Sequence, residues 1–142
     1  MTHIAWQENQ RDIVIEVDVV VVGSGAGGSA CAVALARHGL KVAIVEAGAW
    51  RDPADYPSSM FGALRDLYDN FGSNLARGRA LWPIVQGRTV GGGTVINSAI
   101  VVHTPSDIFD TWQQEHGFGG NWQDELWAHQ ETLDQELKVQ TT

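Results

Sequence analysis

The first stretch with clear chemical potential is a glycine-rich turn, Gly23 to Gly28. Gly23 permits a tight turn, Gly25 removes a side chain where a pyrophosphate would approach the backbone, and Gly28 lets a following helix pack closely. The unpaired N–H groups and partial positive charge of a helix N-terminus also suit a phosphate. The candidate phosphate-binding residues are Gly23, Ser24, Gly25, Ala26, Gly27 and Gly28.

The second chemical feature is an acid, Glu46, which lies 18 residues beyond Gly28. This is near the roughly 20-residue spacing expected for a carboxylate that accepts hydrogen bonds from a ribose. A carboxylate disfavours a 2′-phosphate, because two unit charges about 4 Å apart interact by roughly 4 kcal/mol at an effective dielectric constant of 20. We therefore expect Glu46 and Ala47 to bind the adenosine end of FAD or NAD rather than NADP.

A second glycine-rich stretch runs from Gly87 to Ile100. The run Gly91 to Gly93 loses much backbone entropy on folding, so it suits a place where backbone lies against a flat ring or a phosphate. Arg88 can neutralise a phosphate, and Thr94 can cap a helix. The alternative is a plain hairpin or linker turn. The candidate cofactor-binding residues here are Arg88, Val90, Gly92, Gly93, Thr94, Asn97 and Ser98.

The elements around the first turn predict a βαβ unit and the α/β fold class. Val19 to Val22 is a short β-branched run, typical of a parallel strand buried on both faces. An alanine-rich helix follows from Ser29, and Gly39 is placed to end it. Leu40 to Val45 predicts a second buried strand, and Cys31 is interpreted as a small core residue.

The rest of the chain predicts additional helices and long loops. Pro53 and Pro57 break regular structure, so residues 47–59 read as a loop. The span 47–80 reads equally as a lid over a ligand or as a solvated surface excursion. Within it, 60–68 is a short helix and 70–78 a loop. Further expectations are an extended piece over 82–86, a helix over 107–116 capped by Ser106, and a helix over 122–139 capped by Asn121.

Length and composition limit the classes of function. The chain has 142 residues, which suits one domain, with 17 acidic against 9 basic residues, which argues against a nucleic-acid partner. One cysteine permits no intrachain disulfide, and the longest apolar runs are far short of a transmembrane span. Residues 1–16 lack the apolar core of a signal peptide and read as an N-terminal arm, so the expected location is cytoplasmic.

Together, the two glycine stretches resemble the glucose–methanol–choline (GMC) oxidoreductase family, which uses FAD. Val19 to Glu46 is similar to the general FAD fingerprint. Gly87 to Asn97 resembles the family's own signature of Gly-Arg-x-aliphatic-Gly-Gly, two small residues, then x-aliphatic-Asn. Three further features resemble the family's bacterial alcohol-oxidising branch, namely Thr104 to Asp107, Trp112 and the tail Leu133 to Val139.

The resemblance implies a Rossmann-like FAD-binding fold and roles for both stretches. Residues 23–28 would bind the pyrophosphate and Glu46 the ribose, while 88–94, Asn97 and Ser98 would lie along the pyrophosphate and the flavin. Some relatives attach the flavin covalently through a histidine where this chain has Asn97, so we expect non-covalent FAD. Two positions depart from the family pattern, which often has an aromatic or Ala at Val101 and Arg at His103.

Family members are several times longer, with a catalytic histidine and its His or Asn partner near the C-terminus. The five histidines of this chain suggest no paired arrangement, no Cys/His cluster suggests a metal, and no Ser/His/Asp set suggests nucleophilic catalysis. Residues 17–142 are thus predicted to be a truncated FAD-binding domain without the substrate domain, and not catalytically competent alone. The histidines are His3, His38, His103, His116 and His129.

In the complete enzyme, the resemblance implies that a base takes the hydroxyl proton of a small-molecule alcohol while hydride passes to flavin N5. Two alternatives remain open from the residues. One is a stand-alone NAD-binding module, which leaves the second glycine stretch unexplained. The other is a non-catalytic remnant with open strand edges and exposed apolar surface, which would self-associate or associate with a missing C-terminal portion.

Overall fold

The computed structural model describes residues 2–5 and 12–140 of the chain. They form two compact units that divide between Ser98 and Ala99. The predicted N-terminal arm, residues 1–16, lies partly outside the described residues, and its described part contains no helix or strand. Among the described residues, no helix has the length and apolar character needed to cross a membrane.

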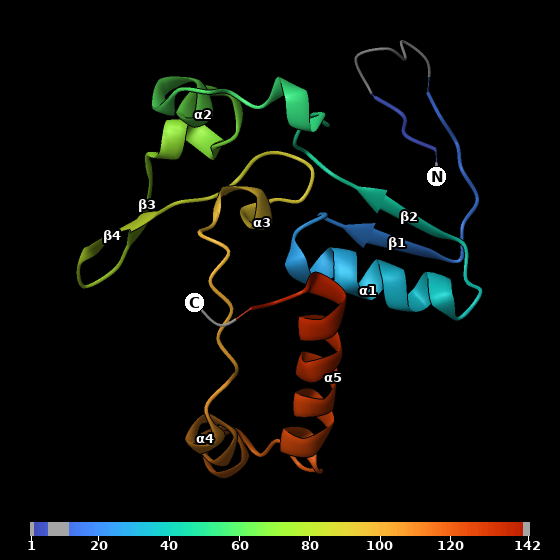
Figure 1. The fold of residues 1–142 in the computed structure, drawn as a ribbon, viewed down its shortest axis with the longest axis vertical. Helices are drawn as coiled ribbons and strands as arrows, with labels where there is room; N and C mark the ends of the chain where they lie inside the picture. The colour runs from blue at the N-terminus through green and yellow to red at the C-terminus, as the bar shows by residue number, and fades with distance from the viewer. Residues whose placement is uncertain (1, 6–11, 141–142) are drawn as a thin grey trace. The chain divides into compact units, whose positions relative to one another are not determined.

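The first unit begins with a parallel βαβ arrangement, as predicted. Strand β1 spans Val19–Val22, helix α1 spans Ala26–Arg37, and strand β2 spans Val42–Val45. The two strands pair in parallel, with Val19 opposite Val42 and Val22 opposite Val45. Helix α1 runs alongside the strand pair (Figure 1) and ends just before Gly39, whose φ of 85° is left-handed. The predicted α/β class and Rossmann-like start are confirmed.

The close approach of α1 to β1 depends on Gly28. A Cβ atom at this position would collide with the carbonyl oxygen of Gly23 and lie 3.4 Å from a methyl group of Val21. Val21 and Ala32 are buried beside it. The third glycine of the turn therefore has the helix–strand packing role that its position predicts.

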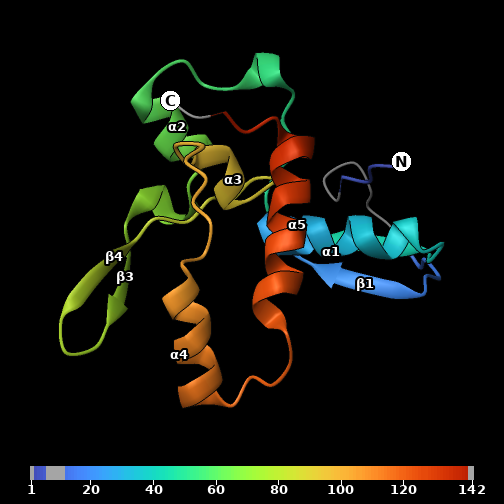
Figure 2. The same cartoon turned by 60° about the horizontal axis from the view of Figure 1, so that its bottom comes forward.

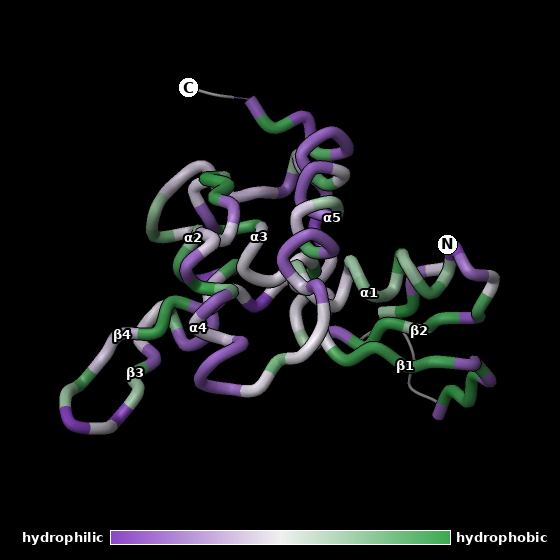
Figure 3. Tube along the Cα trace, turned by 90° about the horizontal axis from the view of Figure 1, so that it is seen from below, coloured by the Kyte–Doolittle hydropathy of each residue, from purple (hydrophilic) through white to green (hydrophobic). Residues whose placement is uncertain are grey.

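The face of the strand pair that points away from α1 is exposed to solvent. Val20, Val22 and Val45 share this face by register and are 56%, 85% and 58% exposed. Figure 3 shows the apolar character of both strands as two adjacent green runs. The expectation of strands buried on both faces is wrong for this structure, because only α1 covers the pair.

The prediction that Cys31 is a core residue is also wrong. Cys31 is exposed, whereas its neighbour Ala32 is buried. Gly28 and Ala32 are four residues apart and therefore lie on the same face of the helix, which is the face that packs on the strands. Cys31 is rotated by about 100° from Ala32, and its side chain leaves the packed face.

The remainder of the first unit contains one predicted helix and one hairpin, whose pairing was not predicted although its second strand overlaps the extended piece expected over 82–86. Helix α2 spans Met60–Asp66, and the Ser59 side chain caps it by accepting a hydrogen bond from the N–H of Gly62 at 3.1 Å. Strands β3, Asn74–Arg77, and β4, Leu81–Ile84, pair antiparallel (Figure 2). Short 3-10 turns cover Pro53–Asp55 and Asp69–Gly72. Strand β3 replaces the loop expected over 70–78, since a strand this short and polar shows no apolar alternation.

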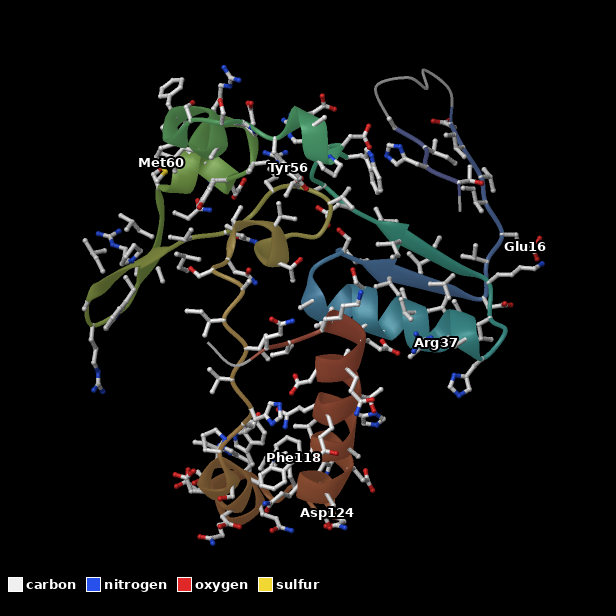
Figure 4. The ribbon with its side chains drawn as sticks, viewed as in Figure 1. Glu16, Arg37, Tyr56, Met60, Phe118 and Asp124 are labelled. Atoms are coloured by element: carbon white, nitrogen blue, oxygen red, sulfur yellow. The ribbon has the colours of Figure 1, made fainter. Side chains whose placement is uncertain are left out.

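The second unit is a pair of helices, α4 over Ser106–His116 and α5 over Trp122–Leu137. Phe109 is buried and its ring meets Trp112 edge-on at 5.6 Å, while Phe118 meets Trp122 at 5.9 Å. Figure 4 shows Phe118 among aromatic rings between the two helices. Both predicted helices are confirmed.

The predicted caps of these two helices differ in detail. Ser106 is the first residue of α4 rather than its cap, because Pro105 holds the cap position. Asn121 does precede α5, but its side-chain amide donates to Asp124 at 2.6 Å instead of accepting from the helix backbone.

Replacing Gly28 with alanine should destabilise the first unit. The added methyl group meets the Gly23 carbonyl, and overpacking of this kind costs about 1–3 kcal/mol. Gly27→Ala is the matched control, because a Cβ there meets nothing within 4 Å and alanine is the better helix former. Urea unfolding should give a lower midpoint for Gly28→Ala and an equal or higher one for Gly27→Ala. Equal midpoints for the two variants would contradict the close packing described here.

Candidate functional site

The two glycine stretches meet at the side chain of Ser24. The Ser24 hydroxyl accepts a hydrogen bond from the N–H of Gly91 at 2.8 Å and donates one to Oε2 of Glu46 at 2.7 Å. The backbone N–H of Ser24 donates to the same carboxylate oxygen at 2.8 Å. Three segments that are far apart in sequence therefore converge on one residue, which is only 5% exposed.

Glu46 is held in place by these contacts as an ionised carboxylate. Its second oxygen, Oε1, accepts a hydrogen bond from the N–H of Gly48 at 2.7 Å. Burial alone would raise the pKa of Glu46, but the hydrogen bonds from Ser24 and Gly48 together lower that pKa below its ordinary value of 4.5. The carboxylate expected to face a ribose therefore also fixes the backbone at Ser24 and at Gly48.

A second contact joins the second glycine stretch, at Thr89, to the segment that follows β2. The segment just after Glu46 forms a parallel bridge between Ala49 and Thr89. The Thr89 hydroxyl and the N–H of Val90 both donate to the Ala49 carbonyl, at 3.0 and 3.1 Å. Thr89 is 1% exposed. A Cβ at Gly48 would collide with the Thr89 backbone, so glycine is needed at position 48 for this approach.

The turn in the second stretch requires glycine for a different reason. Gly91 and Gly92 have φ values of 95° and 55°, where side chains are unfavourable. The N–H of Gly92 closes the turn on the Thr89 carbonyl at 2.8 Å. A Cβ on Gly92 would lie 3.3 Å from Cα of Gly25, so the turn lies directly against the first glycine stretch.

The N-terminus of α1 is open to an anion. Its cap residue is Gly25, which provides no side-chain hydrogen bond, and the first helical turn contains no acidic residue. Cβ atoms built on Gly25 or Gly27 would meet nothing within 4 Å. The helix N–H groups and the free space at Gly25 fit a pyrophosphate, while Glu46 beside Ser24 supplies the acceptor expected for a ribose.

Other predicted residues lie further from this junction. The side chain of Arg88 is 60% exposed, and its guanidinium lies 3.7 Å from the carboxylate of Asp69. Thr94 lies inside the short helix α3, Gly93–Ile96, and donates its hydroxyl to the Gly91 carbonyl at 2.7 Å. The predicted cap role of Thr94 is wrong, because Gly92 holds the cap position. Exposed residues of the candidate set are Ala26, Gly27, Ala47, Arg88, Gly93, Thr94, Asn97 and Ser98.

Asn97 lines a pocket of about 340 Å³ in the first unit. Part of its wall comes from the end of the second glycine stretch and part from α2 and the residues that flank it. This places α2, which belongs to the span interpreted as a lid or a surface excursion, beside the second stretch. The lining residues are Pro57, Ser58, Ser59, Met60, Ala63, Leu67, Tyr68, Val95, Ile96 and Asn97.

Sequence reasoning missed Gly48 and Thr89 as site-forming residues and gave Ser24 only a phosphate-binding role. A small residue two positions after the acid was a weak signal for Gly48. Nothing in the sequence marks Thr89 as buried, because its burial depends on pairing with Ala49 across the fold.

Histidines were predicted to be unpaired, and His103 is an exception. Its Nε2 lies 2.7 Å from the Asp134 carboxylate in the second unit, where both side chains are partly exposed. The Thr104 N–H donates to Gln130 at 3.1 Å beside it, so these contacts tie the segment before α4 to α5. Within residues 2–5 and 12–140, no group of three or more His, Cys, Asp or Glu is placed to hold a metal ion.

Comparison with known proteins gives one family match, described as GMC oxidoreductase, over residues 17–142. Similar curated proteins include the long-chain-alcohol oxidase FAO3 of Arabidopsis thaliana, 37% identical over 76% of this chain. A GMC-type oxidoreductase of Mycobacterium tuberculosis, Rv0492c, is 35% identical over 89% of this chain. Cholesterol oxidase of Acinetobacter baumannii is 27% identical over 87% of this chain.

The chain spans only a small part of these relatives. The aligned segment covers 14% of the Arabidopsis protein, 20% of the Mycobacterium protein and 23% of the Acinetobacter protein. The similarity is therefore evidence about the region that contains the two glycine stretches.

Acidification should weaken the first unit partly through Glu46. Because the native pKa of Glu46 is lowered, its contribution to stability is full above the ordinary value of 4.5 and is lost as pH falls through the native pKa. The Glu46→Gln chain should lose less of its urea midpoint than the parent chain when the pH is lowered from about 7 to about 3. Glu16→Gln, at an exposed glutamate (Figure 4), should respond like the parent. An identical acid response of all three chains would refute the role of Glu46.

Replacing Gly48 with alanine should release the second glycine stretch. The methyl group would collide with the Thr89 backbone, so the bridge between Ala49 and Thr89 would open. The measurement is the rate of tryptic cleavage after Arg88, which should rise several-fold, because proteolysis follows local opening. Gly78→Ala is the control, since a Cβ there meets nothing within 4 Å. Unchanged cleavage in Gly48→Ala would show that the bridge does not hold this segment.

Proposed function

The chain belongs to the GMC oxidoreductase family, and we propose that it binds FAD non-covalently as the cofactor-binding part of an alcohol-oxidising flavoenzyme. The family is FAD-dependent, and the match runs from Val17 through both glycine stretches. Binding of FAD by this chain and the activity of the whole protein are the proposal.

The observation that carries the proposal is the junction of the two glycine stretches. Ser24 connects Glu46 and Gly91 through hydrogen bonds of 2.7 and 2.8 Å, and Gly92 lies against Gly25. A stand-alone NAD module would need only the first stretch. The packing of the second stretch onto the first supports a cofactor that extends along both.

Each part of the junction has a role in holding the cofactor. The uncapped N–H groups of α1 and the free space at Gly25 would bind the pyrophosphate. Glu46 would orient the adenosine ribose through its carboxylate. Some relatives attach the flavin covalently through a histidine at the position of Asn97, and the asparagine here supports non-covalent binding. When bound, FAD supplies the hydride acceptor for oxidation of a carbon that bears a hydroxyl group.

The proposed substrate class is an alcohol, which the names of the relatives support. One relative is a long-chain-alcohol oxidase and another is a cholesterol oxidase. The described residues offer no candidate for the base that must take the hydroxyl proton. His103 and Asp134 form a pair, but it lies in the second unit and links α5 to the segment before α4. We therefore propose that this chain alone retains flavin without turning over alcohol.

Replacing Gly25 with serine tests the phosphate role without harming the fold. Gly25 has extended backbone at the cap position of α1, where a serine side chain would accept hydrogen bonds from the helix N–H groups. Thermal stability should stay equal or rise, whereas FAD affinity should fall at least about tenfold, because the serine occupies the donors that a phosphate needs. Flavin fluorescence titration measures the affinity, and Gly78→Ser, at an open position, is the matched control.

Three outcomes would contradict the proposal. Tight binding of NADH with no affinity for FAD in the same titration would favour the NAD-module alternative. Robust alcohol-driven dye reduction by this chain would contradict the claim that it lacks its catalytic base. Equal FAD affinity of the parent and Gly25→Ser would place the phosphates elsewhere.

A further inference from the structure

We propose that Ser24 is a positioning residue that makes the placement of the second glycine stretch depend on the Glu46 carboxylate. The inference deepens the proposed function and rests on it for its purpose, since both stretches are proposed to hold one cofactor. The glycine pattern of the first turn leaves position 24 unspecified, so the pattern does not predict this role.

The direction of the hydrogen bonds around Ser24 is forced. The backbone N–H of Gly91 can only donate, so the Ser24 oxygen must accept at this 2.8 Å contact. A hydroxyl group has one proton and two lone pairs, and the ionised Glu46 carboxylate can only accept. The proton of Ser24 must therefore point to Glu46 Oε2, 2.7 Å away. The carboxylate fixes the hydroxyl, and the fixed hydroxyl presents its lone pair to Gly91.

Burial keeps water from replacing this arrangement. Ser24 is 5% exposed, and its other polar groups are also occupied. Its N–H donates to Glu46 at 2.8 Å, and its carbonyl accepts from the Ser29 hydroxyl at 2.7 Å. A hydrogen bond to a charged group is stronger than a neutral one, and neighbouring bonds in a chain polarise each other. Loss of the carboxylate would leave the Ser24 hydroxyl free to rotate and weaken its bond to Gly91.

The consequence is mechanical coupling between two ends of the candidate site. Gly91 begins the left-handed turn at φ of 95°, and the following residue, Gly92, lies against Gly25. The acid expected at the ribose thus also fixes the turn expected nearer the flavin. Ser24 acts through its neighbours, so it is a positioning residue rather than a catalytic one.

Amide hydrogen exchange of the cofactor-free chain, resolved at Gly91 by NMR, tests the coupling. Ser24→Ala should speed exchange at Gly91 by about tenfold, the effect of losing one hydrogen bond. Glu46→Leu should do so as well, because the Glu46 carboxylate fixes the Ser24 hydroxyl that accepts from Gly91. In the Ser24→Ala background, Glu46→Leu should add nothing at Gly91, which is the signature of a shared pathway.

Two controls separate positioning from loss of fold. Ser29→Ala removes a hydroxyl bond of the same 2.7 Å length from the same turn without touching Glu46 or Gly91, so exchange at Gly91 should not change. Exchange at Val21, which is buried in β1, reports whether each variant stays folded. If Glu46→Leu loses protection at Val21, Glu46→Asp replaces it, because the shorter side chain withdraws the carboxylate from Ser24.

The outcomes distinguish this inference from the proposed function. Unchanged exchange at Gly91 in Ser24→Ala, or equal effects of the Glu46 variant with and without Ser24, would overturn the coupling. Failure of the parent chain to bind FAD would overturn the proposed function and leave the exchange result intact. If the parent chain binds FAD and the coupling is observed, Ser24→Ala should weaken FAD binding by about tenfold relative to Ser29→Ala. This is the fold-change expected from one charge-assisted hydrogen bond.

Discussion

The hydrogen bonds of the Ser24 hydroxyl are the interaction on which the candidate site depends. Without them, the turn at Gly91 would depend on the contacts around Thr89 and on the packing of Gly92 against Gly25. The carboxylate of Glu46 gives this junction its strength, because donors from Ser24 and Gly48 surround an ionised acceptor. One acid therefore serves both as a proposed ligand contact and as an organiser of local structure.

A steric constraint accompanies this electrostatic one. A Cβ atom at Gly28 would collide with the Gly23 carbonyl, one at Gly48 would collide with the Thr89 backbone, and one at Gly92 would lie 3.3 Å from Cα of Gly25. Glycine at position 28 lets α1 pack on β1, and glycine at position 48 lets the segment after β2 approach the second glycine stretch. Glycine at position 92 lets the second turn pack on the first. Gly25 differs, because a Cβ atom built there would meet nothing within 4 Å. Glycine is thus required by packing at some positions, while at Gly25 it leaves room for a ligand.

One face of the β1–β2 pair is exposed, which is unusual for a parallel sheet. Such sheets are normally covered on both faces, yet Val20, Val22 and Val45 are largely exposed here. The chain spans 14–23% of the relatives to which it is similar. The site junction nevertheless lies entirely within the first unit, on the side of the strands where their carboxyl ends lead into Gly23 and Glu46.

The sequence by itself determined the βαβ unit, helices α2, α4 and α5, and the family, because local patterns encode them: β-branched runs, glycine spacing, apolar periodicity and proline breaks. Only the tertiary structure decided that Ser24 joins the stretches, that Thr89 is buried against Ala49, and that Cys31 faces outward. It also decided the hairpin of β3 and β4. These features depend on pairing between distant segments and on which helix face packs. The local sequence around a hydroxyl group or a short polar strand does not indicate which distant segment it will contact.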